Sequence, residues 1–140
     1  MATDSDQVLS VERGGFPALG MKIGMIEATI DISSLAAAND RVQVFNLESA
    51  SLVLAIGHEV MTQGTGSVTM SYGVASSSAG SATTLAGELA VDGTAGTKLA
   101  SAVTTNVLVA ADDPIVAEVS ATCSAGSLRV WAIIADIENF

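Results

Sequence analysis

Hydrophobic and polar residues alternate along much of this chain with the period of a β-strand. From residue 26 to residue 32, Ile and Ala at even positions alternate with Glu, Thr and Asp at odd positions. A period of two is typical of a strand with one face on a core and the other in water. Residues 41–47 resume the alternation, and residues 52–61 are more continuously apolar, which predicts a more deeply buried strand.

The same pattern predicts two hairpins in the rest of the chain. In residues 67–74 the apolar positions share one face, and the Gly-Thr-Gly turn before them predicts a hairpin with the preceding strand. Residues 115–123 and 128–137 are two strand-like runs joined by Ser-Ala-Gly-Ser, which predict a closing hairpin.

Shorter elements complete the expected order. Strands are expected at residues 85–91 and 99–109. Residues 75–84, rich in Ser, Ala, Gly and Thr, predict an exposed loop, and residues 33–40 form a connector with room for one helical turn. Seven or eight short strands without a sustained helical period predict an all-β fold, an antiparallel β-sandwich with a jelly roll as its favoured form. We expect this domain to span residues 25–140.

Residues 1–24 predict an extended N-terminal arm. Glycines and Pro17 interrupt this segment too often for a helix or a long strand, yet it carries apolar side chains that need a surface to dock on. The arm could lie on its own domain, reach a neighbouring subunit, or have no fixed structure. The candidate contact residues of the arm are Val8, Val11, Phe16 and Leu19.

The composition favours a protein that binds other proteins. Hydrophobic residues make up 49% of the chain and charged residues 14%, which leaves little charge to coat the surface of a monomer. The net charge is −10 and the five basic residues are scattered, which argues against binding to nucleic acid or to an anionic membrane. Aromatic residues are only 4%, which disfavours a ring-lined ligand pocket. Neither a signal peptide nor a membrane-spanning run is recognisable, so we expect synthesis and assembly in a cytoplasm.

Chemistry-bearing residues are few. His58 is the only histidine and Cys123 the only cysteine, and we interpret both as ordinary strand residues. A single histidine with no nucleophile beside it does not make a catalytic triad or a histidine-rich metal site. The Gly-Thr-Ala-Gly-Thr-Lys run at residues 93–98 has the wrong spacing for a phosphate-binding loop. We therefore expect no enzyme activity and no cofactor.

Acidic residues leave two alternatives open. Asp112, Asp113 and Glu118 could be proposed as a glycosidase pair, although Asp-Asp-Pro is also good turn chemistry. Asp92, Asp112 and Asp113 could hold calcium if their loops converged, without the spacing of an EF-hand.

Trp131 and Tyr72 are the large amphipathic rings. Exposed together, they would make a sugar-binding platform or an interface anchor. Trp131 shares one face of its strand with Arg129 and Ile133, and the other face is apolar throughout, with Leu128, Val130, Ala132 and Ile134. We therefore expect this strand to lie between the core and a second surface, and Trp131 to contact a subunit or partner.

Six segments of the chain show strand patterns in a recognisable order, namely Ile30–Ile32, Asp40–Leu47, Leu52–Thr62, Gly66–Gly73, Asp112–Val119 and Gly126–Ala132. This order resembles that of small capsid decoration (cement) proteins of tailed bacteriophages. The resemblance covers roughly residues 24–137 and consists of strand patterns without chemical signatures. The N-terminal arm lies outside it.

The resemblance implies a β-sandwich subunit, often a homotrimer, on the outer surface of the phage head. There it would bind across boundaries between major capsid proteins and stabilise the shell of the virion. The alternatives are another virion component, such as a head fibre base, a tail protein or a minor capsid protein, and then a carbohydrate-binding β-sandwich.

Overall fold

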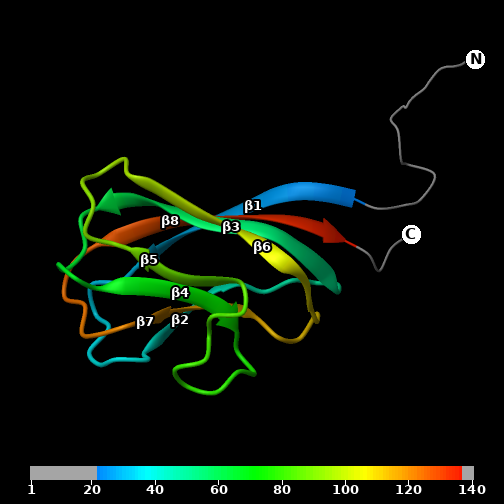
Figure 1. The fold of residues 1–140 in the computed structure, drawn as a ribbon, viewed down its shortest axis with the longest axis horizontal. Coiled ribbons are helices and arrows are strands. Elements are labelled where there is room, and N and C mark those ends of the chain that lie inside the picture. The colour runs from blue at the N-terminus through cyan, green and yellow to red at the C-terminus, as the bar shows by residue number, and fades with distance from the viewer. Residues whose placement is uncertain (1–21, 137–140) are drawn as a thin grey trace, which may run out of the picture.

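The computed structural model describes residues 22–136, which form eight strands joined by turns and loops (Figure 1). No helix occurs within that range, and the connector at residues 33–40 consists of turns and one isolated bridge, from Leu35 to Cys123. The strands are β1 (Lys22–Asp31), β2 (Arg41–Phe45), β3 (Ser51–Thr62), β4 (Thr69–Val74), β5 (Ala86–Ala90), β6 (Lys98–Val109), β7 (Ile115–Val119) and β8 (Ser127–Asp136).

The strands form two antiparallel sheets that pack face to face (Figure 1). One sheet has the order β1-β8-β3-β6 and the other β2-β7-β4-β5. The first strand pairs with the last, the second with the seventh, the third with the sixth and the fourth with the fifth. One long hairpin rolled into two sheets is the jelly-roll arrangement. The predicted β-sandwich is therefore confirmed, in the jelly-roll form.

Both predicted hairpins are wrong, although the strands themselves lie where the alternation placed them. β3 and β4 belong to different sheets, and so do β7 and β8. The turns between them cross the sandwich instead of returning the chain beside its own strand. Alternation reports which residues face the core, and a crossing turn keeps that face inward just as a hairpin does.

The core lies between the two sheets and consists of aliphatic side chains with few rings. Ile56 and Val130 from the first sheet, and Met70 and Ile115 from the second, are completely buried in one continuous cluster. Burying a side chain of this size contributes about 1.5 to 3 kcal/mol relative to leaving it exposed. Cys123 is also buried there, as its small-residue strand context predicted.

Candidate interaction surface

The outward side of the sheet β1-β8-β3-β6, which we call the open face, is ordered in rows by strand register. Ile23, Ala135, Leu52 and Leu108 are cross-strand partners and form an aliphatic row. The next row contains Met25, Ile133 and Ala55, and the one after it Glu27, Trp131, Gly57 and Ala100. The last row is polar, with Thr29, Arg129, Glu59 and Lys98. The face thus changes from apolar at one end to charged at the other.

Exposed large hydrophobic side chains concentrate on this sheet. Among the side chains that the structure describes, four are large, hydrophobic and exposed, namely Ile23 (63%), Met25 (63%), Met61 (42%) and Leu108 (55%). All four belong to β1, β3 or β6, and none to the second sheet. Three of the four, Ile23, Met25 and Leu108, lie in the two apolar rows of the open face. Scattered apolar side chains are ordinary on a monomer, but a cluster on one face indicates a binding surface.

Trp131 occupies the middle of the open face, partly buried. Its neighbours Val130 and Ala132 point into the core, which confirms the predicted alternation along β8. The indole lies over Gly57, because a Cβ atom placed on Gly57 would come within 2.7 Å of its Cζ2 atom. Because Gly57 has no side chain, it leaves a recess on β3 that the indole ring of Trp131 fills.

The charged end of the open face, formed by the last row together with Glu27 of the row before it, is a network of two acidic and two basic side chains. Arg129 donates a hydrogen bond to Glu59 and lies 3.7 Å from Glu27, while Lys98 lies 3.8 Å from Glu59. The hydrogen bond from Arg129 lowers the pKa of Glu59, and the same bond raises the pKa of Arg129. Surface ion pairs contribute little to stability, so the network matters mainly because it leaves this part of the face electrically neutral.

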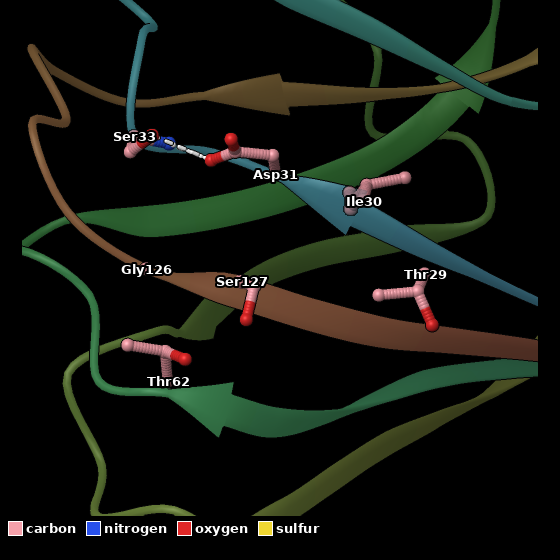
Figure 2. A pocket seen from close by; sticks show the side chains of 7 residues that line it. All are labelled: Thr29, Ile30, Asp31, Ser33, Thr62, Gly126 and Ser127. Carbon is pink, nitrogen blue, oxygen red and sulfur yellow. Dashed lines mark hydrogen bonds between the residues drawn. The ribbon is translucent and has the colours of Figure 1, made fainter.

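A shallow hollow borders the charged end of the open face (Figure 2). Asp31 accepts hydrogen bonds there from the backbone N–H of Ser33, at 2.8 Å, and from the Ser33 hydroxyl, at 2.6 Å. These bonds lower the pKa of Asp31. The carboxylate thus fixes the turn after β1. The hollow is lined by Thr29, Ile30, Asp31, Ser33, Thr62, Gly126 and Ser127.

The central strands of the second sheet, in contrast, are covered by the chain itself. The loop at residues 75–84 is exposed at its tip, as predicted, but its return segment lies on β4 and β7. Ala82 is completely buried, and a Cβ atom on Gly73 would come within 2.8 Å of the Ala82 backbone. All five residues of β7 are buried: Ile115, Ala117 and Val119 lie in the core between the sheets, and Val116 and Glu118 lie on the side that carries the loop.

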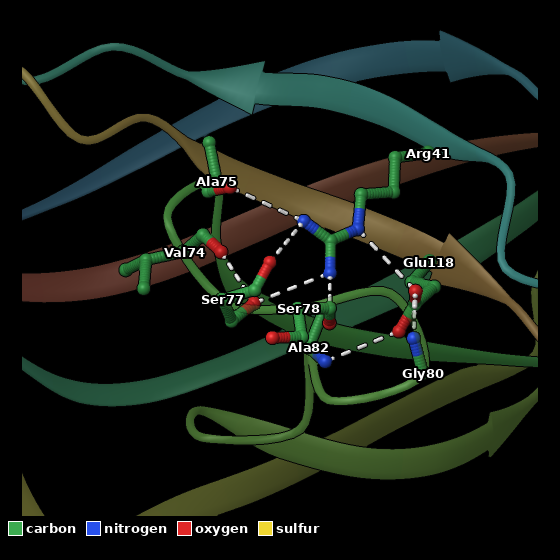
Figure 3. Close-up of polar contacts among 8 residues, drawn as sticks. All are labelled: Arg41, Val74, Ala75, Ser77, Ser78, Gly80, Ala82 and Glu118. Atoms are coloured by element: carbon green, nitrogen blue, oxygen red, sulfur yellow. Dashed lines mark hydrogen bonds and ion pairs between the residues drawn. The ribbon is translucent and has the colours of Figure 1, made fainter.

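An ion pair between strands holds that loop (Figure 3). The Nε atom of Arg41, on β2, lies 3.3 Å from Glu118, on β7. Glu118 also accepts hydrogen bonds from the backbone N–H groups of Gly80 (2.8 Å) and Ala82 (3.1 Å). The guanidinium donates to the backbone carbonyls of Ala75, Ser77 and Ser78. Burial alone would raise the pKa of Glu118, but these hydrogen bonds and the Arg41 charge lower it below its ordinary value.

Three of the four carboxylates weighed as catalytic or calcium-binding groups, Glu118, Asp113 and Asp92, have structural partners. Glu118 is held by Arg41 and the loop, and Asp113 accepts hydrogen bonds from the backbone N–H and the hydroxyl of Ser76. The carboxylate of Asp92 accepts a hydrogen bond from the Ser67 backbone. Within residues 22–136, no group of three His, Cys, Asp or Glu side chains lies close enough together to hold a metal ion.

Tyr72 is completely buried, which excludes the alternative of a sugar-binding platform or interface anchor made by Tyr72 and Trp131 together. Both Tyr72 and His58 are completely buried between the sheets. The Nε2 atom of His58 lies 2.9 Å from the carbonyl of Ala90 and Nδ1 lies 2.7 Å from the Tyr72 hydroxyl. Because a carbonyl can only accept, Nε2 donates to Ala90 and Nδ1 accepts from Tyr72. Burial raises the pKa of Tyr72, so its proton stays in place.

His58 is expected to make the fold sensitive to mild acid. Burial lowers its pKa below the ordinary 6.5, and the hydrogen bond to Ala90 only partly opposes this. Below about pH 6.5 the unfolded chain therefore binds a proton that the folded chain does not, and stability falls with falling pH. Thermal unfolding from about pH 7 to about pH 5.5 should show this slope. His58→Gln should be less stable yet have a flatter slope, and an unchanged slope would contradict the assignment.

Of the predicted contact residues, only Trp131 lies in the described part of the chain. Val8, Val11, Phe16 and Leu19 lie outside it, as does most of the predicted arm, although residues 22–24 already belong to β1. Sequence reasoning did not find Ile23, Met25 and Leu108 as surface residues. The strand predicted at residues 26–32 could have been extended towards the N-terminus to include Ile23. The alternation does not, however, predict that the outward-facing residues of this extension are apolar.

Comparisons with known proteins find the fold elsewhere but no family. No protein-family model matches this sequence, and neither does any curated protein. A chain in the solved structure of the cyanophage Pam1 capsid asymmetric unit is similar over 96% of this chain and 94% of that one, with a TM-score of 0.58 and 18% identity. At that identity the likeness shows a shared fold.

No helix long and apolar enough to span a membrane occurs among residues 22–136.

Proposed function

We propose that this chain is a structural protein of a phage virion and, more specifically, a decoration (cement) subunit of a tailed-phage head. The observation that supports this most is the jelly roll shared, over nearly the whole of both chains, with a chain from a phage capsid structure. The protein would act by binding, since the side chains with catalytic potential in the described residues serve the core and the loop. His58 is buried with Tyr72, and Glu118 is held by Arg41.

In this role the chain binds on the outside of the head, across boundaries between major capsid proteins. A net charge of −10 suits the outer surface better than the inside of a DNA-filled shell, where phosphates would repel it. Copies assemble in the host cytoplasm as a homo-oligomer, with the trimer as the state that the family resemblance implies. The arm supplies contacts to the capsid, and binding at many repeated sites gives avidity to a weak single contact.

The proposal is tested by adding purified, gold-labelled protein to heads that lack it. We expect label over the whole shell in negative-stain images. Label confined to one vertex or to the tail would contradict the decoration role and favour a head fibre base, a tail protein or a minor capsid protein. Absence of label from heads and tails alike would contradict a virion role altogether.

A matched variant lacking residues 2–20 tests the arm in the same experiment. We expect its occupancy of the heads to fall about tenfold or more, because a docked aromatic such as Phe16 is worth on the order of 3 kcal/mol. Circular dichroism and thermal unfolding of the variant provide the control for folding. Equal occupancy by the truncated and full chains would remove the arm from the mechanism.

A further inference from the structure

We propose that the open face is the surface through which copies of this chain meet one another. The inference rests on the proposed structural role, in which several copies assemble, but its test needs no capsid and can fail alone. Three features of the described residues carry it: the asymmetry between the two sheets, the charge balance of the face, and its area.

The asymmetry shows which sheet needs a partner. The second sheet carries the loop at residues 75–84 on its central strands, fixed by Arg41 and Glu118. Among the side chains that the structure describes, no loop is held over the open face in this way, and its first two rows are entirely apolar. Ile23 and Met25 lie on β1, at the edge of the sheet in the described structure, and both remain 63% exposed. Exposure of these apolar side chains to water is unfavourable, and their burial against a second protein surface would be favourable.

The charge balance favours a second copy as the partner. The chain carries a net charge of −10, so most approaches between two copies are opposed by repulsion. On the open face, however, Glu27 and Glu59 are balanced by Lys98 and Arg129. A face whose charges all had the same sign would require an oppositely charged partner. A neutral face that carries both signs can bind a second copy of itself, with acidic side chains of one copy pairing with basic side chains of the other.

The area of the face is of the right order for such a contact. Four strands about 4.8 Å apart, with about ten residues at 3.3 Å each, give a face on the order of 500 Å² in projection. Projecting side chains raise the accessible area above that figure, and a standard interface buries about 800 Å² on each partner. Trp131, held over Gly57 in the middle of the face, would be a central aromatic anchor.

The test is the molar mass of the full chain, measured by light scattering after size exclusion over a range of concentrations. We expect a mass of two or three subunits, and a dissociation constant raised about tenfold or more by Met25→Lys. The matched control is Gln43→Lys, which adds the same charge at an exposed position on β2 of the other sheet and should leave the mass unchanged.

Three results would overturn the proposal. A monomer at every concentration shows that copies do not associate in solution, and an oligomer that survives Met25→Lys shows that they meet elsewhere. In a chain lacking residues 2–20, we expect association to persist. Loss of association in this variant would identify residues 2–20, and not the open face of a second copy, as the segment that joins the subunits. Thermal unfolding of each variant separates these results from a failure to fold.

Discussion

Glu118→Ala is expected to destabilise the folded chain by about 3 kcal/mol, because it removes one partner of a buried ion pair. The Glu118 side chain is 5% exposed and that of Arg41 21%, so water compensates Arg41 only partly. The variant also leaves the backbone N–H groups of Gly80 and Ala82 without their acceptor, and Ala82 is completely buried. Urea unfolding should show the lower midpoint. The control is Glu88→Ala, at an exposed position on β5, where little change is expected.

The same carboxylate contributes to acid sensitivity with a definite sign. Because the pKa of Glu118 is depressed in the folded state, its contribution is fully present above the ordinary value of 4.5 and is lost as pH falls through the folded-state value. The loss of the Glu118 contribution begins only below about pH 4.5, whereas the His58 slope already begins below about pH 6.5. Cleavage by a protease within residues 75–84 should increase in Glu118→Ala. If the Glu118→Ala variant resists cleavage and urea as well as the wild-type chain does, the proposed role of the ion pair is contradicted.

The positions of the strands could be predicted from the sequence because alternation is a local property. β1, β3 and β8 lie within a few residues of the expected runs, and Trp131 lies on the expected side of its strand. The order of the strands could not be predicted in the same way. A short turn can join two strands of the same sheet or two strands of opposite sheets. Which of the two occurs depends on the packing of all the strands of the jelly roll and not on the turn itself.

The polar interactions were missed because their partners are far apart in sequence. Arg41 and Glu118 are 77 residues apart, and the sequence shows Arg41 only as one of five scattered basic residues and Glu118 only as a candidate for a glycosidase pair. His58 and Tyr72 are on strands of opposite sheets, and only the packing of the sheets brings the two rings together. A histidine between apolar strand residues was a correct sign of burial, but the pattern contained no information about its partner.

Gly57→Ala is expected to cost about 2 to 3 kcal/mol, the upper part of the range for overfilling a packed site. The added methyl group would lie 2.7 Å from the ring of Trp131 and 2.9 Å from the Cα atom of Ala100 on β6. Displacement of the indole would relieve only one of these contacts, because the methyl group would also clash with the backbone carbonyl of Leu99, so β6 must move away from β3 as well. Backbone atoms of β6 cannot yield as a flexible side chain would, so both stability and the shape of the open face should change.

Trp131 is the only tryptophan in the chain, which makes its fluorescence a specific measurement for this variant. We expect emission of the folded Gly57→Ala chain to shift to longer wavelength as the ring becomes more exposed, together with a lower urea midpoint. The matched control is Gly24→Ala on β1 of the same sheet, where an added Cβ atom meets nothing within 4 Å. The same midpoint and the same emission in both variants would mean that the indole does not rest on Gly57. If the ring is displaced but stability is kept, weaker association of copies would be the specific consequence, because the anchor and not the fold has then been lost.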